Sequence, residues 1–314
     1  MEGIKSIIEV VWGGILGMGW YVVAGIALSA LIKTWKLDRR FWVILNKGGG
    51  WVVVLAAVAG IFSPLCSCGV LPIVVTLIES GSPLAPAMAL LITSPIADPS
   101  SIMVNYAALG MGLTVVKVAG ALFMGLFAGF LTRWLVQVGW LSDDAFSGRP
   151  RRGYCDAKVD PDNPTVVPID TSPVVGNKVP FFFARAKDSA LIIGKFFLIA
   201  LVVQGVIETY VPVNWVYALG AGDGPMAIFY ATMLGLPLPV NGLSAVPVVK
   251  GLMHSGAGMG IGPAAAFLMA GPVTSIPAII ALLGMFKRRV FYIYILVGFV
   301  GSMVVGYAAQ FFLS

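Results

Sequence analysis

The sequence predicts an all-α polytopic membrane protein made of two inverted repeats, each with a re-entrant hairpin and a proline-broken helix. Three observations support this fold class. First, the 314-residue chain is 59% hydrophobic and 11% charged, whereas soluble domains carry roughly 25% charged residues. Second, several apolar runs of about 20 residues are long enough to cross a bilayer core of about 30 Å. Third, prolines recur at a constant spacing on both sides of a polar linker.

The long apolar runs are the predicted membrane spans. They are Val10–Ile32, Leu113–Leu135, Ala190–Tyr210 and Val290–Leu313. The first run is longer than a signal-peptide core, and no small-residue cleavage pattern follows it. We therefore expect this run to be retained as a span.

The repeat appears when the two sides of the linker are aligned. Pro64, Pro72 and Ser80-Gly81 match Pro239, Pro247 and Ser255-Gly256 at one constant offset in residue number. After a short insertion, Pro86-Ala87, Ala89 and Pro95 match Pro263-Ala264, Ala266 and Pro272 at a second constant offset, called the repeat offset below. A repeat that flanks a polar linker is typical of duplicated transporter folds. We predict a first membrane repeat at 1–140, a polar linker at 141–187 and a second membrane repeat at 188–314.

The topology follows from segment length and loop charge. The segments Trp51–Phe62 and Val70–Glu79 would each be about 18 Å long as helices, too short to cross a bilayer alone. If they form a re-entrant hairpin, the basic loops Lys33–Lys47 and Lys287–Arg289 lie on the cytoplasmic side together with the linker, as the positive-inside rule requires. The alternative, one broken span, puts the linker on the opposite side from these two loops.

Composition also excludes several function classes. The sequence contains no G-x-x-x-x-G-K-[ST] motif, so no P-loop binds ATP. The basic residues lie in short connections, where they set orientation, so nucleic-acid binding is not expected. Three cysteines are too few for a disulfide framework, and no cofactor is predicted.

The run Pro64–Gly69 has the composition of a bend with free backbone groups, which must be buried in protein or line a polar cavity. It carries Cys66, Ser67 and Cys68. Two thiols one residue apart can bind one soft ion when the backbone is not helical, which makes Cys66 and Cys68 candidate metal ligands. The alternatives are close packing of two small side chains and a strained disulfide. Asn241 occupies the position equivalent to Cys66, where it could contribute to a site or cap the bend.

The segments Pro83–Leu109 and Pro263–Leu283 are predicted to be discontinuous helices, because prolines interrupt each of them. Polar residues cluster at both breaks, where helix ends and unpaired amides could meet a substrate. The candidate substrate-binding residues are Thr93, Ser94, Asp98, Thr274 and Ser275. The alternative is that the prolines serve packing alone.

Ionisable residues inside apolar segments are costly and call for an explanation. They are Glu79, Asp98, Lys117, Lys195, Glu208, Lys250 and His254. Most of them are expected near the membrane interface. Asp98, at a helix break, is the first candidate for coupling to a proton or to substrate; Glu79 and His254, each followed by Ser-Gly, are weaker ones. Cys155 is interpreted as an incidental thiol of the linker.

The run Pro64–Pro72 and the later Pro263–Pro272 resemble the ArsP-type predicted permeases. The similarity covers nearly the whole chain. It implies export of trivalent arsenicals, organic or inorganic, from the bacterial cytoplasm across the inner membrane, with Cys66 and Cys68 as candidate ligands.

The leading hypothesis is therefore a multi-pass permease of the bacterial inner membrane that exports a small thiophilic metalloid without ATP, and not an enzyme. Two alternatives are a transporter of reduced sulfur or selenium species that acts by thiol exchange, and a membrane thiol-redox enzyme. A homodimer is compatible with the repeat but is not specified by it.

Overall fold

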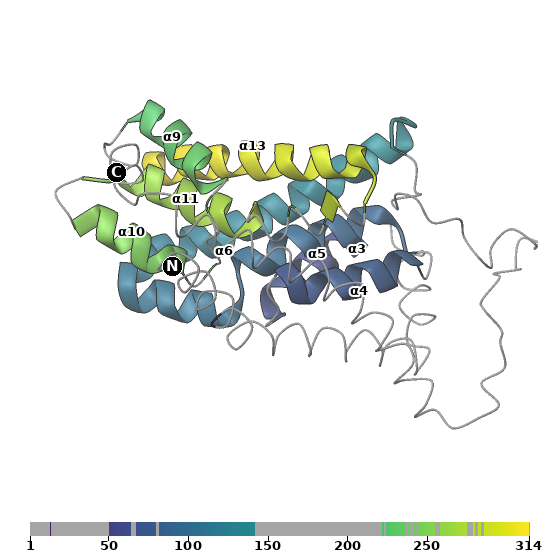
Figure 1. The fold of residues 1–314 in the computed structure, drawn as a ribbon, viewed down its shortest axis with the longest axis horizontal. Helices are drawn as coiled ribbons and strands as arrows, with labels where there is room; N and C mark the ends of the chain where they lie inside the picture. The colour runs from purple at the N-terminus through teal and green to yellow at the C-terminus, as the bar shows by residue number, and fades with distance from the viewer. Residues whose placement is uncertain are drawn as a thin grey trace, which may run out of the picture.

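The computed structural model describes residues 50–63, 67–79, 82–141, 224–236, 244–254, 258–274 and 286–313, together with Gly13, Gly222, Leu238, Gly242, Ile279, Leu282 and Leu283. The helices of this part are α3 (Trp51–Phe62), α4 (Ser67–Glu79), α5 (Leu84–Ile96), α6 (Pro99–Gln137), α9 (Pro225–Gly235), α10 (Ala245–His254), α11 (Ile261–Val273) and α13 (Arg288–Leu313). Figure 1 shows that they form an elongated helical bundle, with α3, α4 and α5 toward one end and α9, α10 and α11 toward the other.

Helix α4 corrects one expectation. Ser67, Cys68 and Gly69 were expected in a non-helical bend, but α4 already begins at Ser67. Proline restricts its own residue and the one before it, so the residues after Pro64 are free to enter a helix.

The break expected between Pro95 and Pro99 is present. Helix α5 ends at Ile96 and α6 begins at Pro99, while Ala97 and Asp98 have non-helical dihedral angles. Pro99 suits the first helical position, because the amide that it lacks would be unpaired there in any case.

Helix α6 is two helices that fold back on each other at Gly110. Gly110 has φ 83° and ψ −177°, a backbone conformation that favours glycine. Lys117 Nζ lies 2.5 Å from Ser101 Oγ, although a straight helix would separate these residues by about 24 Å. Residues 99–109 therefore continue the path of α5, and residues 111–137 return beside both.

Close contacts fix how these segments pack in the first half. A side chain on Gly129 would meet Val53, the Ala89 methyl group and, at 3.2 Å, the carbonyl oxygen of Ala85. Small residues let helix backbones approach this closely. Helices α3, α5 and α6 are thus held together around Gly129.

The second half makes the corresponding contacts around Gly306, which the repeat offset pairs with Gly129. A side chain on Gly306 would meet Ile228, the Ala266 methyl group and, at 3.1 Å, the carbonyl oxygen of Gly262. The same offset pairs Ala266 with Ala89 and Gly262 with Ala85. The residues of α9, α11 and α13 therefore meet in the same pattern as those of α3, α5 and α6.

Helices α6 and α13 cross in an antiparallel arrangement. Gly112 lies against Leu313, Gly120 against Val305, and Gly301 against Met124. Residue numbers therefore rise along α6 while those of the contacting residues fall along α13. The buried positions of α6 from Lys117 onward recur in α13 at the repeat offset. They are Lys117, Gly120, Ala121, Met124, Gly125, Ala128, Gly129 and Thr132 in α6 and Tyr294, Val297, Gly298, Gly301, Ser302, Val305, Gly306 and Ala309 in α13.

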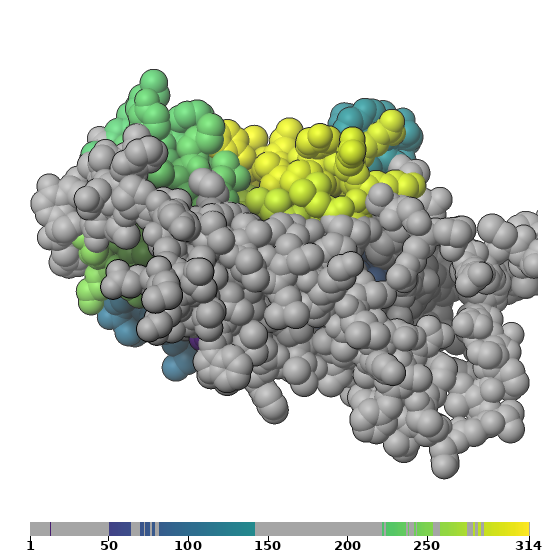
Figure 2. Space-filling model, viewed as in Figure 1, coloured from purple at the N-terminus to yellow at the C-terminus, as the bar shows by residue number. Residues whose placement is uncertain are grey.

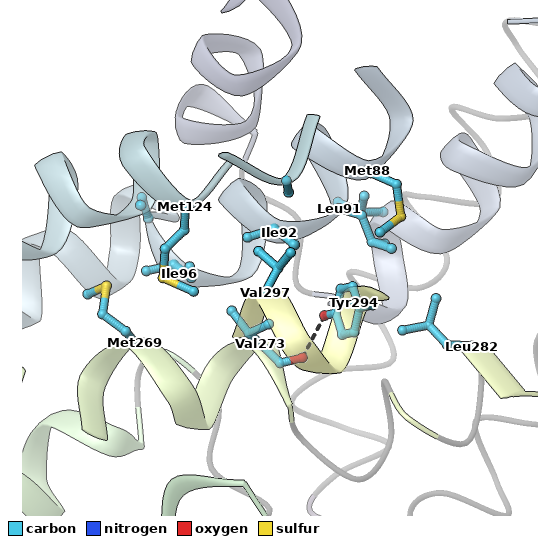
Figure 3. Packing of buried hydrophobic residues seen from close by; sticks show 14 of the residues in the cluster. Met88, Leu91, Ile92, Ile96, Met124, Met269, Val273, Leu282, Tyr294 and Val297 are labelled. Atoms are coloured by element: carbon cyan, nitrogen blue, oxygen red, sulfur yellow. Dashed lines mark hydrogen bonds between the residues drawn. The ribbon is translucent and has the colours of Figure 1, made fainter. Parts of the chain in front are cut away.

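One apolar core joins both halves. Figure 3 shows side chains of α5, including Ile92 and Ile96, beside Met124 of α6 and side chains of α11 and α13. On the outside, large apolar side chains of α13 such as Tyr292 and Phe311 are exposed, and this helix lies along one edge of the surface in Figure 2.

Two helical stretches of the described part, Leu84–Gln137 and Arg288–Leu313, are long and apolar enough to cross a membrane. The first of them combines α5 with α6 and includes the break and the reversal at Gly110.

Candidate functional site

The first-half junction is the break between α5 and α6, and Asp98 organises it. The side chain of Asp98 caps α6, where its Oδ1 accepts a hydrogen bond from the Ser101 amide at 2.9 Å. The Ser100 hydroxyl also donates to Oδ1. A carboxylate at this position stabilises a helix, because the first amides of a helix lack partners and its N-terminal end is partly positive. Asp98 therefore has a structural role here.

Lys117 lies beside this junction and is fully buried, with 0% of its surface exposed. Its ammonium group donates to Ser101 Oγ at 2.5 Å and to the carbonyl oxygen of Gly242 at 3.3 Å. That most intramembrane charges lie near an interface stays a prediction; Lys117 itself is buried inside the protein. Because α6 reverses at Gly110, its side chain faces the first segment of α6 instead of lipid.

Gly242 brings the second half into the same site. A side chain on Gly242 would lie 3.0 Å from the Pro95 carbonyl oxygen, 3.1 Å from Asp98 Oδ2 and 3.1 Å from Ser101 Oγ. This close approach excludes even a methyl group without movement of the break. The first-half junction therefore contains Asp98, Ser101 and Lys117 from one half and Gly242 from the other.

The second-half junction, at the end of α11, contains different groups. The Thr274 hydroxyl donates to the Ala270 carbonyl at 2.7 Å, and the Tyr294 hydroxyl donates to the Val273 carbonyl at 2.5 Å, as drawn in Figure 3. The repeat offset pairs Tyr294 with Lys117. These two bonds join residues of the same half.

The remaining predicted site residues differ in how far the structure describes them. Thr93 and Ser94 are buried in α5, and the Thr93 hydroxyl donates to the Ala89 carbonyl at 2.9 Å. The helical backbone is described for Ser67, Cys68, Glu79 and His254, with Glu79 and His254 as the last residues of α4 and α10. The predictions for Cys66, Asn241 and Ser275 fall outside the described residues.

The polar residues predicted at the two breaks lie at two different junctions and make different hydrogen bonds. Asp98 and Thr274, predicted from the breaks, are found at the two junctions, each with its side chain bonded to nearby groups. Among the described residues, no three His, Cys, Asp or Glu side chains lie close enough together to hold a metal ion.

Lys117 is the site residue that sequence reasoning did not select. A signal was available, because Ala121, Gly125 and Gly129 follow Lys117 at intervals of four positions. Positions four apart share one face of a helix, and small residues mark a face that packs closely on other helices. A lysine on such a face is predicted to be buried.

Nearly the whole chain matches one protein family. Residues 4–311 match the model of the ArsP_1 family, described as predicted permeases. The chain belongs to this family. Membership and the two apolar helical stretches together identify a membrane protein of the permease type.

Three relatives have comparable lengths. The chain is 24% identical over 286 residues to the UPF0718 protein YcgR of Bacillus subtilis, covering 90% of this chain and 89% of the relative. It is 23% identical over 296 residues to the UPF0718 protein MJ0584 of Methanocaldococcus jannaschii, covering 81% and 80%. It is 22% identical over 274 residues to a putative two-component membrane permease complex subunit of Streptococcus mutans, covering 86% and 83%. No solved structure matches the chain.

Proposed function

We propose that the chain is a secondary transporter built from two inverted repeats. The observation that carries this proposal is the antiparallel crossing of α6 and α13, whose equivalent residues meet around Met124 and Gly301. A two-fold axis that exchanges two antiparallel helices is perpendicular to both. If the helices cross the membrane, this axis lies in the membrane plane, which is the relation found in inverted-repeat transporters.

Re-entrant hairpins are part of the same proposal. With 12 and 13 residues, α3 and α4 are each about 18 to 20 Å long, less than the hydrocarbon core of about 30 Å. Gly60 near the end of α3 lies against Thr93, close to the end of α5. This contact puts the end of α3 beside the end of α5, next to the first-half junction, and it supports a re-entrant hairpin formed by α3 and α4.

The proposed substrate is a thiophilic metalloid species, a trivalent arsenical, exported across a bacterial inner membrane. Cys66 and Cys68 are the proposed ligands, because thiolates prefer soft centres. Asp98 is the proposed coupling residue, and the linker at 141–187 is proposed to be cytoplasmic. The name of the streptococcal relative, a putative two-component membrane permease complex subunit, favours transport over thiol-redox catalysis.

The test is uptake of arsenite and of methylarsenite into everted membrane vesicles that contain the chain. Cys66→Ser and Cys68→Ser should each abolish uptake, whereas the matched Cys155→Ser variant should retain it. Unchanged uptake in the first two variants would remove the thiol-ligand mechanism. Uptake of thiosulfate but of neither arsenical would favour sulfur transport, and a Cys66–Cys68 disulfide formed without net uptake would favour a redox enzyme.

A further inference from the structure

Lys117 is held in a place where a charged side chain is costly. Moving an ammonium group out of water is unfavourable unless hydrogen bonds or opposite charges compensate. Lys117 is the one charged side chain among the buried polar residues of the described part. Two hydrogen-bond acceptors, Ser101 Oγ and the Gly242 carbonyl oxygen, compensate its ammonium group together with the opposite charge of Asp98 nearby.

These acceptors come from different halves of the molecule. Ser101 stands at the start of α6, whereas Gly242 lies 125 residues from Lys117, shortly before α10 begins at Ala245. A carbonyl outside a helix must find a donor when it is buried away from water. The Lys117 ammonium supplies that donor, and the two halves are joined at this point.

Gly242 also fits the first-half junction by shape. Its Cα faces Pro95, Asp98 and Ser101 so closely that a Cβ atom would be 3.0 to 3.1 Å from an oxygen of each. Ser101 is shared, since its amide donates to Asp98 and its hydroxyl accepts from Lys117. A displacement of Asp98 would therefore disturb both the Ser101 hydroxyl, which accepts from Lys117, and the close packing of Gly242 against the break.

We propose that Lys117 is a positioning residue that fastens the segment around Gly242, in the second half, to the break at Asp98 in the first half. This inference rests on the proposed transport function, in which one half must move relative to the other. The Lys117–Gly242 hydrogen bond then breaks and re-forms each time the transport site changes the side of the membrane to which it is open. Lys117 acts through the position of this segment and does not touch the substrate.

The experiment measures amide hydrogen exchange of the full-length protein in lipid nanodiscs. Lys117→Met keeps an unbranched side chain of similar size but removes its donors. Exchange in residues 242–254 should then accelerate on the order of tenfold, as expected when one charge-assisted hydrogen bond is lost. Exchange in α11 should not change. Tyr294→Phe is the matched control, because it removes a bond that lies within the second half.

A second variant approaches the contact from the other side. Gly242→Ala introduces a methyl group against Asp98 and Ser101 while Lys117 stays intact, and it should accelerate exchange in residues 242–254 as well. Gly242→Ala also tests the proposal if Lys117→Met does not give a folded protein. Unchanged exchange in both variants, or an equal acceleration in Tyr294→Phe, would overturn the proposal.

Uptake of methylarsenite into everted vesicles separates this inference from the proposed function. If the wild type takes up the arsenical, Lys117→Met should reduce the initial rate on the order of tenfold, while Lys117→Gln, which keeps amide donors, should lose less. A wild-type protein without uptake contradicts the proposed substrate, and the exchange comparison still decides the role of Lys117. Uptake by Lys117→Met at the wild-type rate would overturn the role of Lys117 in the movement of the two halves during transport.

Discussion

The two junctions lie at equivalent positions of the sequence repeat but contain different polar groups. In the first half, Lys117 reaches across the molecule to Gly242. In the second half, Tyr294 at the corresponding position bonds to Val273, a residue of its own half. Equivalent backbones thus carry a buried cation in one place and a neutral phenol in the other. The packing around Gly129 and Gly306 follows the repeat offset, whereas the side chains differ, and at the first-half junction the Lys117 ammonium bonds to a carbonyl of the other half.

The largest expected effect tests the shared packing. Gly129→Val and Gly306→Val should each destabilise the protein by about 3 kcal/mol, because the added side chain meets a backbone carbonyl and a neighbouring methyl group that cannot move aside. Reversible unfolding in mixed detergent micelles measures the change. If one variant is tolerated and the other is not, the two halves do not pack alike.

The next effect concerns the cap at the first-half junction. Asp98→Ala should cost about 1 to 2 kcal/mol of unfolding free energy, since the first turn of α6 loses its acceptor. Asp98→Asn should cost less than Asp98→Ala, because asparagine caps a helix equally well and only the negative charge near the buried Lys117 is lost. The same micelle titration checks both variants. If Asp98→Asn is stable but no longer transports, the charge of Asp98 is needed for coupling and not for the fold; equal losses of stability in both variants would contradict the capping role.

A smaller effect is expected at the second-half junction. Tyr294→Phe removes one buried hydrogen bond to the Val273 carbonyl and should cost about 1 kcal/mol. Uptake in everted vesicles should remain close to that of the wild type. A loss of uptake comparable to that of Lys117→Met would show that the two junctions are functionally alike.

The smallest effect is expected where α6 meets the end of α13. A Cβ atom at Gly112 would lie 3.5 Å from Leu313, an ordinary contact distance, so Gly112→Ala should change the free energy of unfolding by less than about 1 kcal/mol, and alanine's better helix propensity should make the change stabilising. This variant is the control for the Gly129 and Gly306 substitutions. A large loss of stability at Gly112 would mean that the crossing is tighter than these distances indicate.

Much of the local structure was predictable from proline and glycine. Pro95 and Pro99 located the break before α6, and Pro272 located the end of α11, because proline removes a donor and restricts its neighbours. The start of α4 at Ser67 was missed, since the effect of Pro64 does not extend that far along the chain. The repeat offset, read from the prolines, also relates the buried faces of α6 and α13.

The sequence by itself determined the membrane class, the breaks and the correspondence between the halves, because hydrophobic length, proline chemistry and spacing are local properties of the chain. Only the tertiary structure decided that Lys117 is buried and that its partner is the Gly242 carbonyl. That contact depends on the reversal at Gly110 and on how the halves meet. Two residues so far apart in the chain are brought together by the packing of whole helices, and no local pattern in the sequence encodes that packing.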